Sequence, residues 1–386
     1  MGCRAVRAWV TAVGLVLGVV GVGDAARPGS GAPVAMIVVD ADSGTVLAEH
    51  EADRQWPPAS MAKMMTVLVA LERVRAGQVS LDDRVRVSEK ASRMGGSQVY
   101  LAAGEIFSLG QLLEAVMIPS ANDASVAVAE HIAGSTEAFV ELMNRRAQEL
   151  GMTGTRYRSV HGLPPEAGQP PDLTTARDLA TLGRELRKHP EAVRWAATAQ
   201  GTFRNGTLVM RNTNHLLRTF PGATGLKTGY YTAAGFSVTA TARRGEMEVL
   251  AVVLGMPSKQ GCFDHAARLM TEAFATWKTV VAARQGVPIG RIPVSGGRVP
   301  HVRAIPAADL RLLLRRAEDR GLQVEARIPR LLRAPVHQRQ PLGEVVVRRG
   351  DHEMGRVPVV ADGDVPADGW LAWLWNRHSA QATSRP

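Results

Sequence analysis

Cysteine is almost absent from this sequence. Among 386 residues only Cys3 and Cys262 are cysteines. Cys3 lies in a segment with the features of an export signal, in which two arginines precede an apolar run over residues 8–22 and small residues follow. We expect residues 1–26 to be a signal peptide, with an uncleaved anchor as the alternative. The mature protein is then expected to be exported and to be periplasmic or otherwise extracytoplasmic, with a peripheral position on the cytoplasmic membrane as a further option. Cleavage would leave Cys262 alone, so no intrachain disulfide could form and stability would depend on the size of the core.

Lysine is also scarce, although the chain is basic. The sequence has 46 Lys and Arg residues against 36 Asp and Glu residues, and only six of the 46 are lysine. Arginine cannot give up its proton in a protein, whereas a buried lysine can. The scarcity of lysine therefore draws attention to Lys63 and Lys227, which both fall within short motifs.

The sequence offers no recognisable site for nucleic acid or for a metal. Positive charge is spread along the chain without a basic run that contains interleaved aromatic residues, so we predict no nucleic-acid partner. The net charge of +10 favours anionic polymers or membrane lipids instead. The ten histidines show no metal-ligand spacing, so we expect no metal and no other cofactor, and we assign His161 to loop packing.

The order of the expected elements predicts an α/β (α+β) protein with two domains. A hairpin over residues 34–48 precedes a long helical segment, and strands over 235–240 and 247–254 precede a helix over 263–277. This order implies an antiparallel sheet flanked by helices, with a helical lobe beside it. Beyond residue 286, short alternating apolar runs separated by turns predict a small all-β domain. The helices expected in the lobe span 61–71, a segment that begins at Ser108 with capping-box spacing, 122–132, 136–150 and 174–187.

The segment 58–63 reads Pro-Ala-Ser-Met-Ala-Lys and places Ser60 three residues before Lys63. In a helix these two side chains lie one above the other. Residues 61–71 are apolar nearly all round, which is typical of a helix buried inside a domain. Burial disfavours the ammonium form, so Lys63 could take the proton of Ser60, and the positive end of the helix would favour negative charge on the serine oxygen. The pair therefore has the composition of a nucleophile with an adjacent base.

Two further short motifs follow along the chain. Ser120 and Asn122 enclose one residue directly after a proline, and they offer a hydroxyl for proton relay and an amide for bridging. Lys227, Thr228 and Gly229 lead into a predicted strand, where a cation and a hydroxyl could bind a carboxylate while the glycine lets a substrate peptide approach. Either motif alone also fits an ordinary helix cap or strand start. Chance rarely places all three motifs in this order.

With these three motifs the chain resembles the serine penicillin-recognising enzymes, which carry Ser-x-x-Lys, Ser-x-Asn and Lys-Thr-Gly. More narrowly, it resembles the low-molecular-weight D-alanyl-D-alanine carboxypeptidases of peptidase family S11. The resemblance covers roughly residues 34–277, continues more weakly through 334–343, and implies a serine β-lactamase/penicillin-binding transpeptidase-like fold. The longer stretches that carry it lie at 58–66, 120–124, 139–152, 161–164, 174–180 and 225–235.

The resemblance implies a serine carboxypeptidase that removes the terminal D-alanine from peptidoglycan stem pentapeptides. Ser60 would be the nucleophile that forms the acyl-enzyme, and Lys63 would be its base. Ser120 would relay a proton to the departing D-alanine, and Asn122 would hold the substrate chain and Lys63 in place. Peptidoglycan stem peptides and, as covalent inhibitors, β-lactam antibiotics are the partners that this resemblance implies.

The resemblance also implies how the substrate is held. Lys227, Thr228 and Gly229 would receive the end of the peptide, with the first two binding its terminal carboxylate. The backbone N–H groups of Ser60 and Tyr230 would form the oxyanion hole.

The chain departs from the family pattern at three places. Ala121 replaces a glycine in Ser-x-Asn, which a non-glycine residue fits only if the backbone there does not need a positive φ. Asp172 and Leu173 stand where the family commonly has His-x before two hydroxyl residues, and Cys262 stands near the position of a usual arginine. None of these changes removes a predicted catalytic group.

Two other functions compete with this interpretation. A β-lactamase of class A would carry Glu-x-x-Leu-Asn, whereas Glu166 is followed by Ala-Gly-Gln, so we predict slow deacylation of a penicilloyl-enzyme. A non-catalytic wall- or membrane-binding module on the same scaffold is the second alternative.

The expected organisation is a signal peptide at 1–26, a catalytic domain at 27–281, a C-terminal β-sandwich at 285–364 and a Trp-rich tail at 365–386. The tail holds Trp370, Trp373 and Trp375. As a short amphipathic helix it could contact a membrane surface or dock on its own domain, and both readings remain open.

Overall fold

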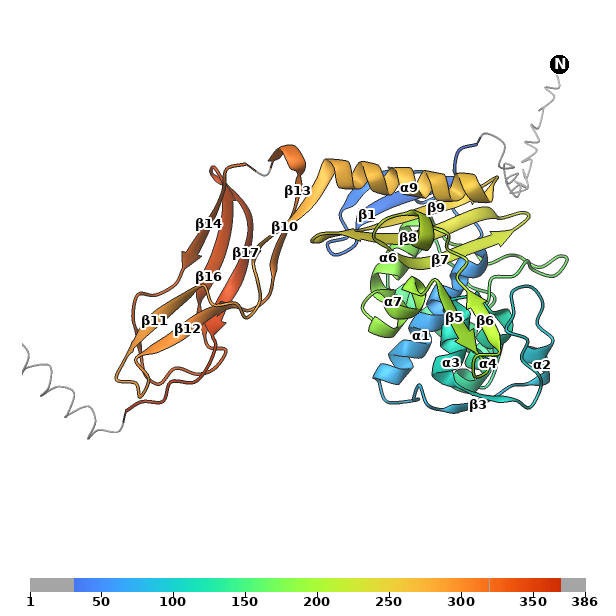
Figure 1. Ribbon diagram of the computed structural model, residues 1–386, viewed down its shortest axis with the longest axis horizontal. Coiled ribbons are helices and arrows are strands. Elements are labelled where there is room, and N and C mark those ends of the chain that lie inside the picture. The colour runs from blue at the N-terminus through green and yellow to red at the C-terminus, as the bar shows by residue number, and fades with distance from the viewer. Residues whose placement is uncertain (1–30, 319, 369–386) are drawn as a thin grey trace, which may run out of the picture.

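The computed structural model describes residues 31–318 and 320–368 (Figure 1). The expected signal peptide and the Trp-rich end of the tail lie outside these described residues. None of the helices in this part of the chain has the length and apolar character needed to cross a membrane.

A five-stranded antiparallel sheet forms the centre of the N-terminal part. Its strand order is β2-β1-β9-β8-β7, so the first hairpin pairs with a strand that follows about two hundred residues later. Every residue of β9 is buried, because this strand lies in the middle of the sheet and helices cover both faces. The strands span β1 (Ala35–Asp40), β2 (Val46–His50), β7 (Ala223–Tyr231), β8 (Gly235–Arg244) and β9 (Met247–Met256).

Helices cover the two faces of this sheet (Figure 1). On one face, α9 (Lys259–Thr276) packs on β8 and β9. On the other face, α6 (Ala176–Leu186) joins the sheet to the helical lobe. The predicted antiparallel sheet flanked by helices is confirmed. The sequence placed the start of α9 at residue 263, whereas Ser258 caps the helix and its first residue is Lys259.

The helical lobe is built around α1 (Lys63–Arg75), which follows a 3-10 turn at Ala59–Ala62. Every residue from Lys63 to Leu71 is buried, as the all-round apolar pattern predicted. The Ser108 capping box is also present. The other helices of this part are α2 (Glu89–Ser92), α3 (Leu109–Met117), α4 (Asn122–Ala133), α5 (Thr136–Glu149), α7 (Pro190–Ala197) and α8 (Leu216–Thr219).

Two small two-stranded sheets in the lobe were not predicted. The first pairs β3 (Arg84–Arg86) with β4 (Ile106–Ser108), which follows after α2, and the second is a hairpin of β5 (Gln200–Phe203) and β6 (Leu208–Arg211). Their strands are three or four residues long, which is too short for a reliable alternation of polar and apolar side chains.

The C-terminal part is all β, as the sequence predicted, and it has its own apolar core. It begins directly after α9 with β10, which pairs with β13, so β10 crosses the boundary that we expected between residues 281 and 285 (Figure 1). A six-stranded sheet in the order β14-β16-β17-β12-β11-β15 completes it. The strands are β10 (Trp277–Ala283), β11 (Gly290–Ser295), β12 (His301–Pro306), β13 (Leu310–Arg315), β14 (Leu322–Arg327), β15 (Leu332–Arg333), β16 (Pro341–Arg349) and β17 (His352–Ala361).

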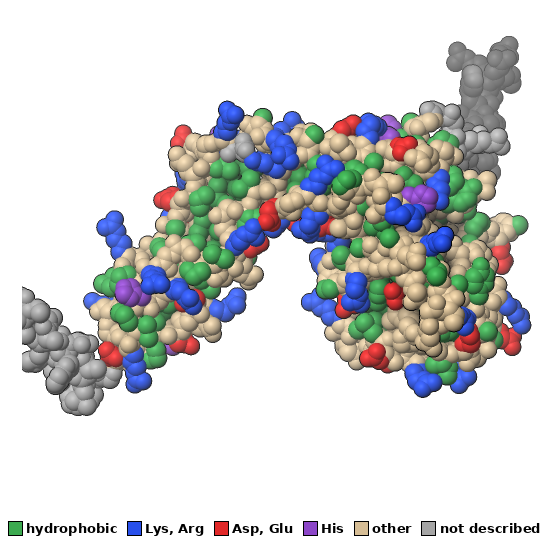
Figure 2. All heavy atoms as spheres, viewed as in Figure 1, with side chains coloured by type: hydrophobic (Ala, Val, Ile, Leu, Met, Phe, Trp, Pro, Cys, Tyr) green, Lys and Arg blue, Asp and Glu red, His purple; other side chains and the backbone are tan. Residues whose placement is uncertain are grey.

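The positive charge of the protein is dispersed on the surface. Figure 2 shows Lys and Arg side chains scattered over both parts of the visible face, with acidic side chains between them. Many arginines in the described part of the chain form ion pairs with carboxylates, such as Arg177 with Asp53 and Arg204 with Glu105.

Candidate active site

Ser60 and Lys63 lie at the junction of the 3-10 turn and α1. The Nζ atom of Lys63 is 2.9 Å from the Oγ atom of Ser60, and it donates a second hydrogen bond of 2.8 Å to the carbonyl oxygen of His161. The Lys63 side chain is fully buried, while Ser60 is only half-buried. This geometry places an amine directly behind a hydroxyl that solvent or a ligand can reach.

The environment of Lys63 favours its neutral form. Burial lowers the pKa of Lys63 well below its usual value, and the nearby charge of Lys227 lowers it further. Asp172 and Asp123 act in the opposite direction, with smaller effects. A neutral amine can accept the proton of Ser60, so the pair has the geometry of a nucleophile with its base, and burial favours the form of the amine that this role needs.

The loop that carries His161 presses against the turn that carries Ser60. A Cβ atom on Gly162 would lie 1.9 Å from the carbonyl oxygen of Ala59, so only glycine fits there. The backbone N–H of Gly162 donates to Ser159 Oγ at 2.8 Å, and Ser159 in turn donates to the buried Asp172. Asp172, one of the departures from the family pattern, therefore anchors the loop whose carbonyl oxygen receives Lys63.

The imidazole of His161 takes part in loop packing. Its Nδ1 atom accepts a hydrogen bond of 3.1 Å from the backbone of Leu163. Burial lowers the pKa of His161 to about 3, so the ring is neutral at ordinary pH. Within residues 31–318 and 320–368, no cluster of three or more His, Cys, Asp and Glu side chains could hold a metal ion.

Ser120 and Asn122 lie where α3 gives way to α4. Ser120 has a φ of +68°, and its Oγ atom is buried with no hydrogen-bond partner among the described residues. Asn122 donates its side-chain amide to the carbonyl oxygen of Gly95 at 2.7 Å, and its Oδ1 atom also has no partner in this part of the chain. Ala121 has a φ of −61°, so alanine fits this backbone without strain.

Strand β7 brings the third motif against the Ser60 turn. A Cβ atom on Gly229 would lie 2.5 Å from the carbonyl oxygen of Pro58, so glycine permits this close approach. The hydroxyl of Thr228 donates to Thr213 Oγ1 at 2.7 Å. Lys227 is 1% exposed and donates to the carbonyl oxygen of Thr228 at 3.3 Å. Burial lowers the pKa of Lys227 to about 7.

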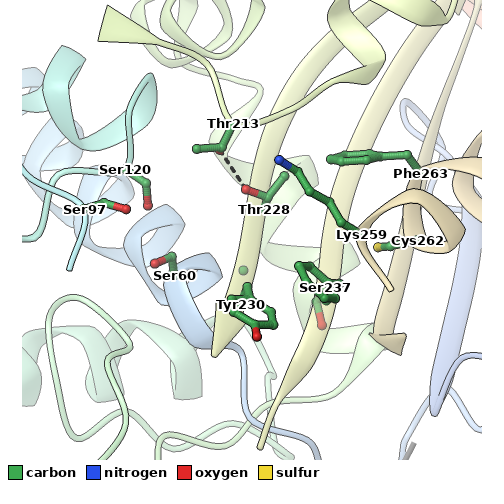
Figure 3. A pocket seen from close by; sticks show the side chains of 12 residues that line it. Ser60, Ser97, Ser120, Thr213, Thr228, Tyr230, Ser237, Lys259, Cys262 and Phe263 are labelled. Carbon is green, nitrogen blue, oxygen red and sulfur yellow. Dashed lines mark hydrogen bonds between the residues drawn. The ribbon is translucent and has the colours of Figure 1, made fainter. Parts of the chain in front are cut away.

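These elements line one open cleft (Figure 3). Five of the residues predicted from the sequence line it, whereas Lys63, Asn122 and Lys227 lie behind its walls. Figure 3 shows three serines on one side of β7, and Lys259, Cys262 and Phe263 on the other. The lining residues are Ser60, Ser97, Ser120, Thr213, Thr228, Gly229, Tyr230, Phe236, Ser237, Lys259, Cys262 and Phe263.

Cys262 is a free and buried thiol. Burial raises its pKa to about 12, so the sulfur stays protonated and unreactive. It forms part of a wall with Phe263, whose ring stacks on His215 at a centroid distance of 5.1 Å.

Comparison with known proteins identifies the family of this chain. The profile of the D-alanyl-D-alanine carboxypeptidases, peptidase family S11, matches residues 25–258. The chain belongs to this family. A second profile, that of the C-terminal domain of penicillin-binding protein 5, matches residues 277–367 of this S11 peptidase.

Relatives cover most of this S11 peptidase. The D-alanyl-D-alanine carboxypeptidase DacF of Bacillus subtilis is 31% identical over 342 residues, which are 88% of this chain and 87% of DacF. DacC of Escherichia coli is 30% identical over 350 residues, 89% of this chain and 86% of DacC.

Solved structures share the fold. A structure of PBP3 from Streptococcus pneumoniae, described as a peptidoglycan synthesis regulatory factor, superposes with a TM-score of 0.71 and 26% identity and covers 86% of this chain and 99% of its own. Penicillin-binding protein 5 from Haemophilus influenzae superposes with a TM-score of 0.67 and 27% identity, covering 88% and 99%. The predicted penicillin-binding transpeptidase-like fold is confirmed.

Proposed function

We propose that Ser60 is the nucleophile of a serine-type D-alanyl-D-alanine carboxypeptidase acting on peptidoglycan stem pentapeptides. Membership of the S11 family makes the protein a carboxypeptidase hydrolase. The observation that carries the assignment of Ser60 is its 2.9 Å separation from a fully buried lysine. Lys63 takes the proton from Ser60 as Oγ attacks the carbonyl carbon of the last peptide bond.

The leaving group then needs a proton. Ser120, whose buried Oγ has no partner among the described residues, relays the proton that Lys63 took from Ser60 to the nitrogen of the departing D-alanine as the C–N bond breaks. Water then hydrolyses the ester on Ser60 and restores the free enzyme. The orphaned Oδ1 of Asn122 supports a role in binding an N–H group of the substrate.

The remaining predicted residues hold the peptide. We assign the oxyanion hole to the backbone N–H groups of Ser60 and Tyr230, which line the cleft together. Thr228 offers its hydroxyl to the terminal carboxylate, with Gly229 beside it. Lys227 lies behind Thr228, so its contribution to carboxylate binding is through its charge rather than through contact.

The test is release of D-alanine from a pentapeptide ending in D-Ala-D-Ala, together with intact mass after incubation with penicillin. We expect release by the wild type and a penicilloyl adduct on Ser60, and neither with Ser60→Ala. Absence of both release and adduct in a folded wild type would contradict the assignment.

We also expect the penicilloyl adduct to be long-lived. No Asp or Glu is found among the described residues that line the cleft, and Glu166 lines a separate cavity with Arg158 and Gln169. No carboxylate is therefore in place to activate water for rapid deacylation. Penicillin turnover within seconds, followed by ultraviolet absorbance of the β-lactam, would favour the β-lactamase alternative instead.

The substrate suggests where the protein acts. Because peptidoglycan lies outside the cytoplasmic membrane, we propose that residues 1–26 direct export and that 27–281 carry catalysis. We propose further that the β-sandwich at 285–364 and the tail at 365–386 place the enzyme near the membrane. Deletion from Trp370 onward followed by membrane fractionation tests the contribution of the tail.

A further inference from the structure

Among the described residues that line the cleft, Lys259 is the one charged side chain. The Lys-Thr-Gly motif had indicated Lys227 instead. Lys227 is buried behind Thr228, and its Nζ atom points to a backbone carbonyl oxygen. Lys259 lines the cleft and is exposed. A carboxylate that enters the cleft therefore meets Lys259 before any other cation.

The side chain of Lys259 is oriented to meet a carboxylate in the cleft. It lies in the first turn of α9, where Ser258 accepts a hydrogen bond from the backbone of Gly261 at 3.1 Å and fixes the start of the helix. Figure 3 shows its amino group extended along the cleft toward the hydroxyls of Thr228 and Thr213, rather than away from the cleft.

The surroundings leave the ammonium group available. Cys262 and Phe263, which follow in α9, form a neutral wall beside Lys259. No acidic side chain lines the cleft among the residues that the structure describes. Burial lowers the pKa of His215, which stacks on Phe263, with the charge of Lys259 as the next cause. The lowered pKa favours the neutral form of this histidine, which does not attract an anion.

We propose that Lys259 is a specificity-determining residue, whose ammonium group binds the C-terminal carboxylate of the substrate, and the carboxylate of β-lactams, together with the hydroxyls of Thr228 and Thr213. This inference rests on the proposed function, since it assigns the group that recognises a free peptide end at that same site. A charge-assisted hydrogen bond of this kind distinguishes a terminal carboxylate from a blocked terminus.

A matched pair of substrates tests the proposal. Both are acyl-D-alanyl thioesters, one with a leaving group that ends in a free carboxylate and the other with the same group as its methyl ester. We expect Lys259→Met to lower kcat/KM for the carboxylate substrate about 10- to 100-fold, the size of a lost hydrogen bond to a charged group, and to leave the ester within about 2-fold. Lys259→Arg keeps the charge and should restore most of the difference.

The controls separate this inference from the proposed function. Lys188→Met removes an exposed lysine outside the cleft and should leave kcat/KM unchanged for both substrates. Ser60→Ala should abolish turnover of both, and failure to do so would overturn the catalytic assignment rather than that of Lys259. An equal loss on both substrates in Lys259→Met, or no loss on the carboxylate substrate, would overturn the role of Lys259.

Discussion

The two buried lysines of the site have their protonation set by the same physical effect. Lys63 and Lys227 are each fully surrounded by protein, and desolvation is the largest cause of the lowered pKa of both. Their mutual repulsion adds to the effect at Lys63. Arginine in place of Lys63 would remain charged and could not accept the proton of Ser60, so a base at this position requires lysine.

The buried Lys227 makes stability depend on pH. Its pKa is about 7 in the folded protein against 10.5 in an unperturbed lysine, so between these values the unfolded chain binds more protons. Relative to Lys227→Met, the wild type should therefore gain stability as pH rises from 7 to 10, by about 1.4 kcal/mol per pH unit. Urea unfolding of both proteins at several pH values measures this difference. Lys188→Met is the control, and parallel profiles for wild type and Lys227→Met would contradict the prediction.

At the scale of elements, the site is made by two close approaches to the Ser60 turn. The loop after His161 reaches it from one side through Gly162, and β7 reaches it from the other through Gly229. The turn itself precedes α1, whose buried face fixes its position in the core. The geometry of the proposed active site therefore depends on two glycines, which have no side chain to contact a substrate.

Gly229→Ala tests one of these approaches. The added Cβ would meet the Pro58 carbonyl oxygen at 2.5 Å, which is backbone and cannot rotate away, so β7 must move from the turn. We expect the rate of acylation by penicillin to fall by about 100-fold, since displacement of reacting groups by about 1 Å costs that much. The measurement is adduct formation against time by intact mass. Gly363→Ala, where nothing lies within 4 Å of the new atom, should react like the wild type, and an unchanged rate in Gly229→Ala would show that the strand can adapt.

The sequence correctly predicted the parts of the fold that depend on interactions between residues close together in the chain. The capping box at Ser108 and the all-round apolar α1 are properties of a few neighbouring residues, and both were predicted correctly. The depth of Lys227 depends on how β7 packs in the sheet, so its motif could not reveal that it lies behind the cleft. Thr213 and Lys259 come from segments without a recognised motif, and only the assembled fold places them beside Thr228.

At the scale of the whole molecule, the S11 peptidase consists of a cleft-bearing part and a β part joined without a linker. Strand β10 begins at Trp277, directly after α9 ends at Thr276. Arg311 of β13 contacts Asp42 at 3.3 Å and Glu246 at 3.2 Å, and both acidic residues lie in turns of the N-terminal part. Arg284 adds a second ion pair to Glu246 at 2.6 Å.

We expect the ion pairs at this junction to control how the two parts are oriented, and to have no effect on D-alanine release in the cleft. Glu246 follows the end of β8 at Arg244, whereas the cleft is lined by Phe236 and Ser237 near the start of the same strand. Glu246→Arg places a cation against Arg311 and Arg284, so the two parts should sample a wider range of orientations. Small-angle X-ray scattering should then report a broader distance distribution, while D-alanine release from a soluble pentapeptide stays within about 2-fold, because exposed ion pairs contribute little to the stability of either part.

Adding Arg311→Glu to Glu246→Arg restores an opposite-charge pair and should narrow the distance distribution again. Arg268→Ala, which breaks an exposed pair within α9, is the control and should leave the scattering unchanged. A loss of turnover in Glu246→Arg would mean that the β part acts on the cleft itself, and that the all-β part helps to shape the catalytic site rather than only to place it.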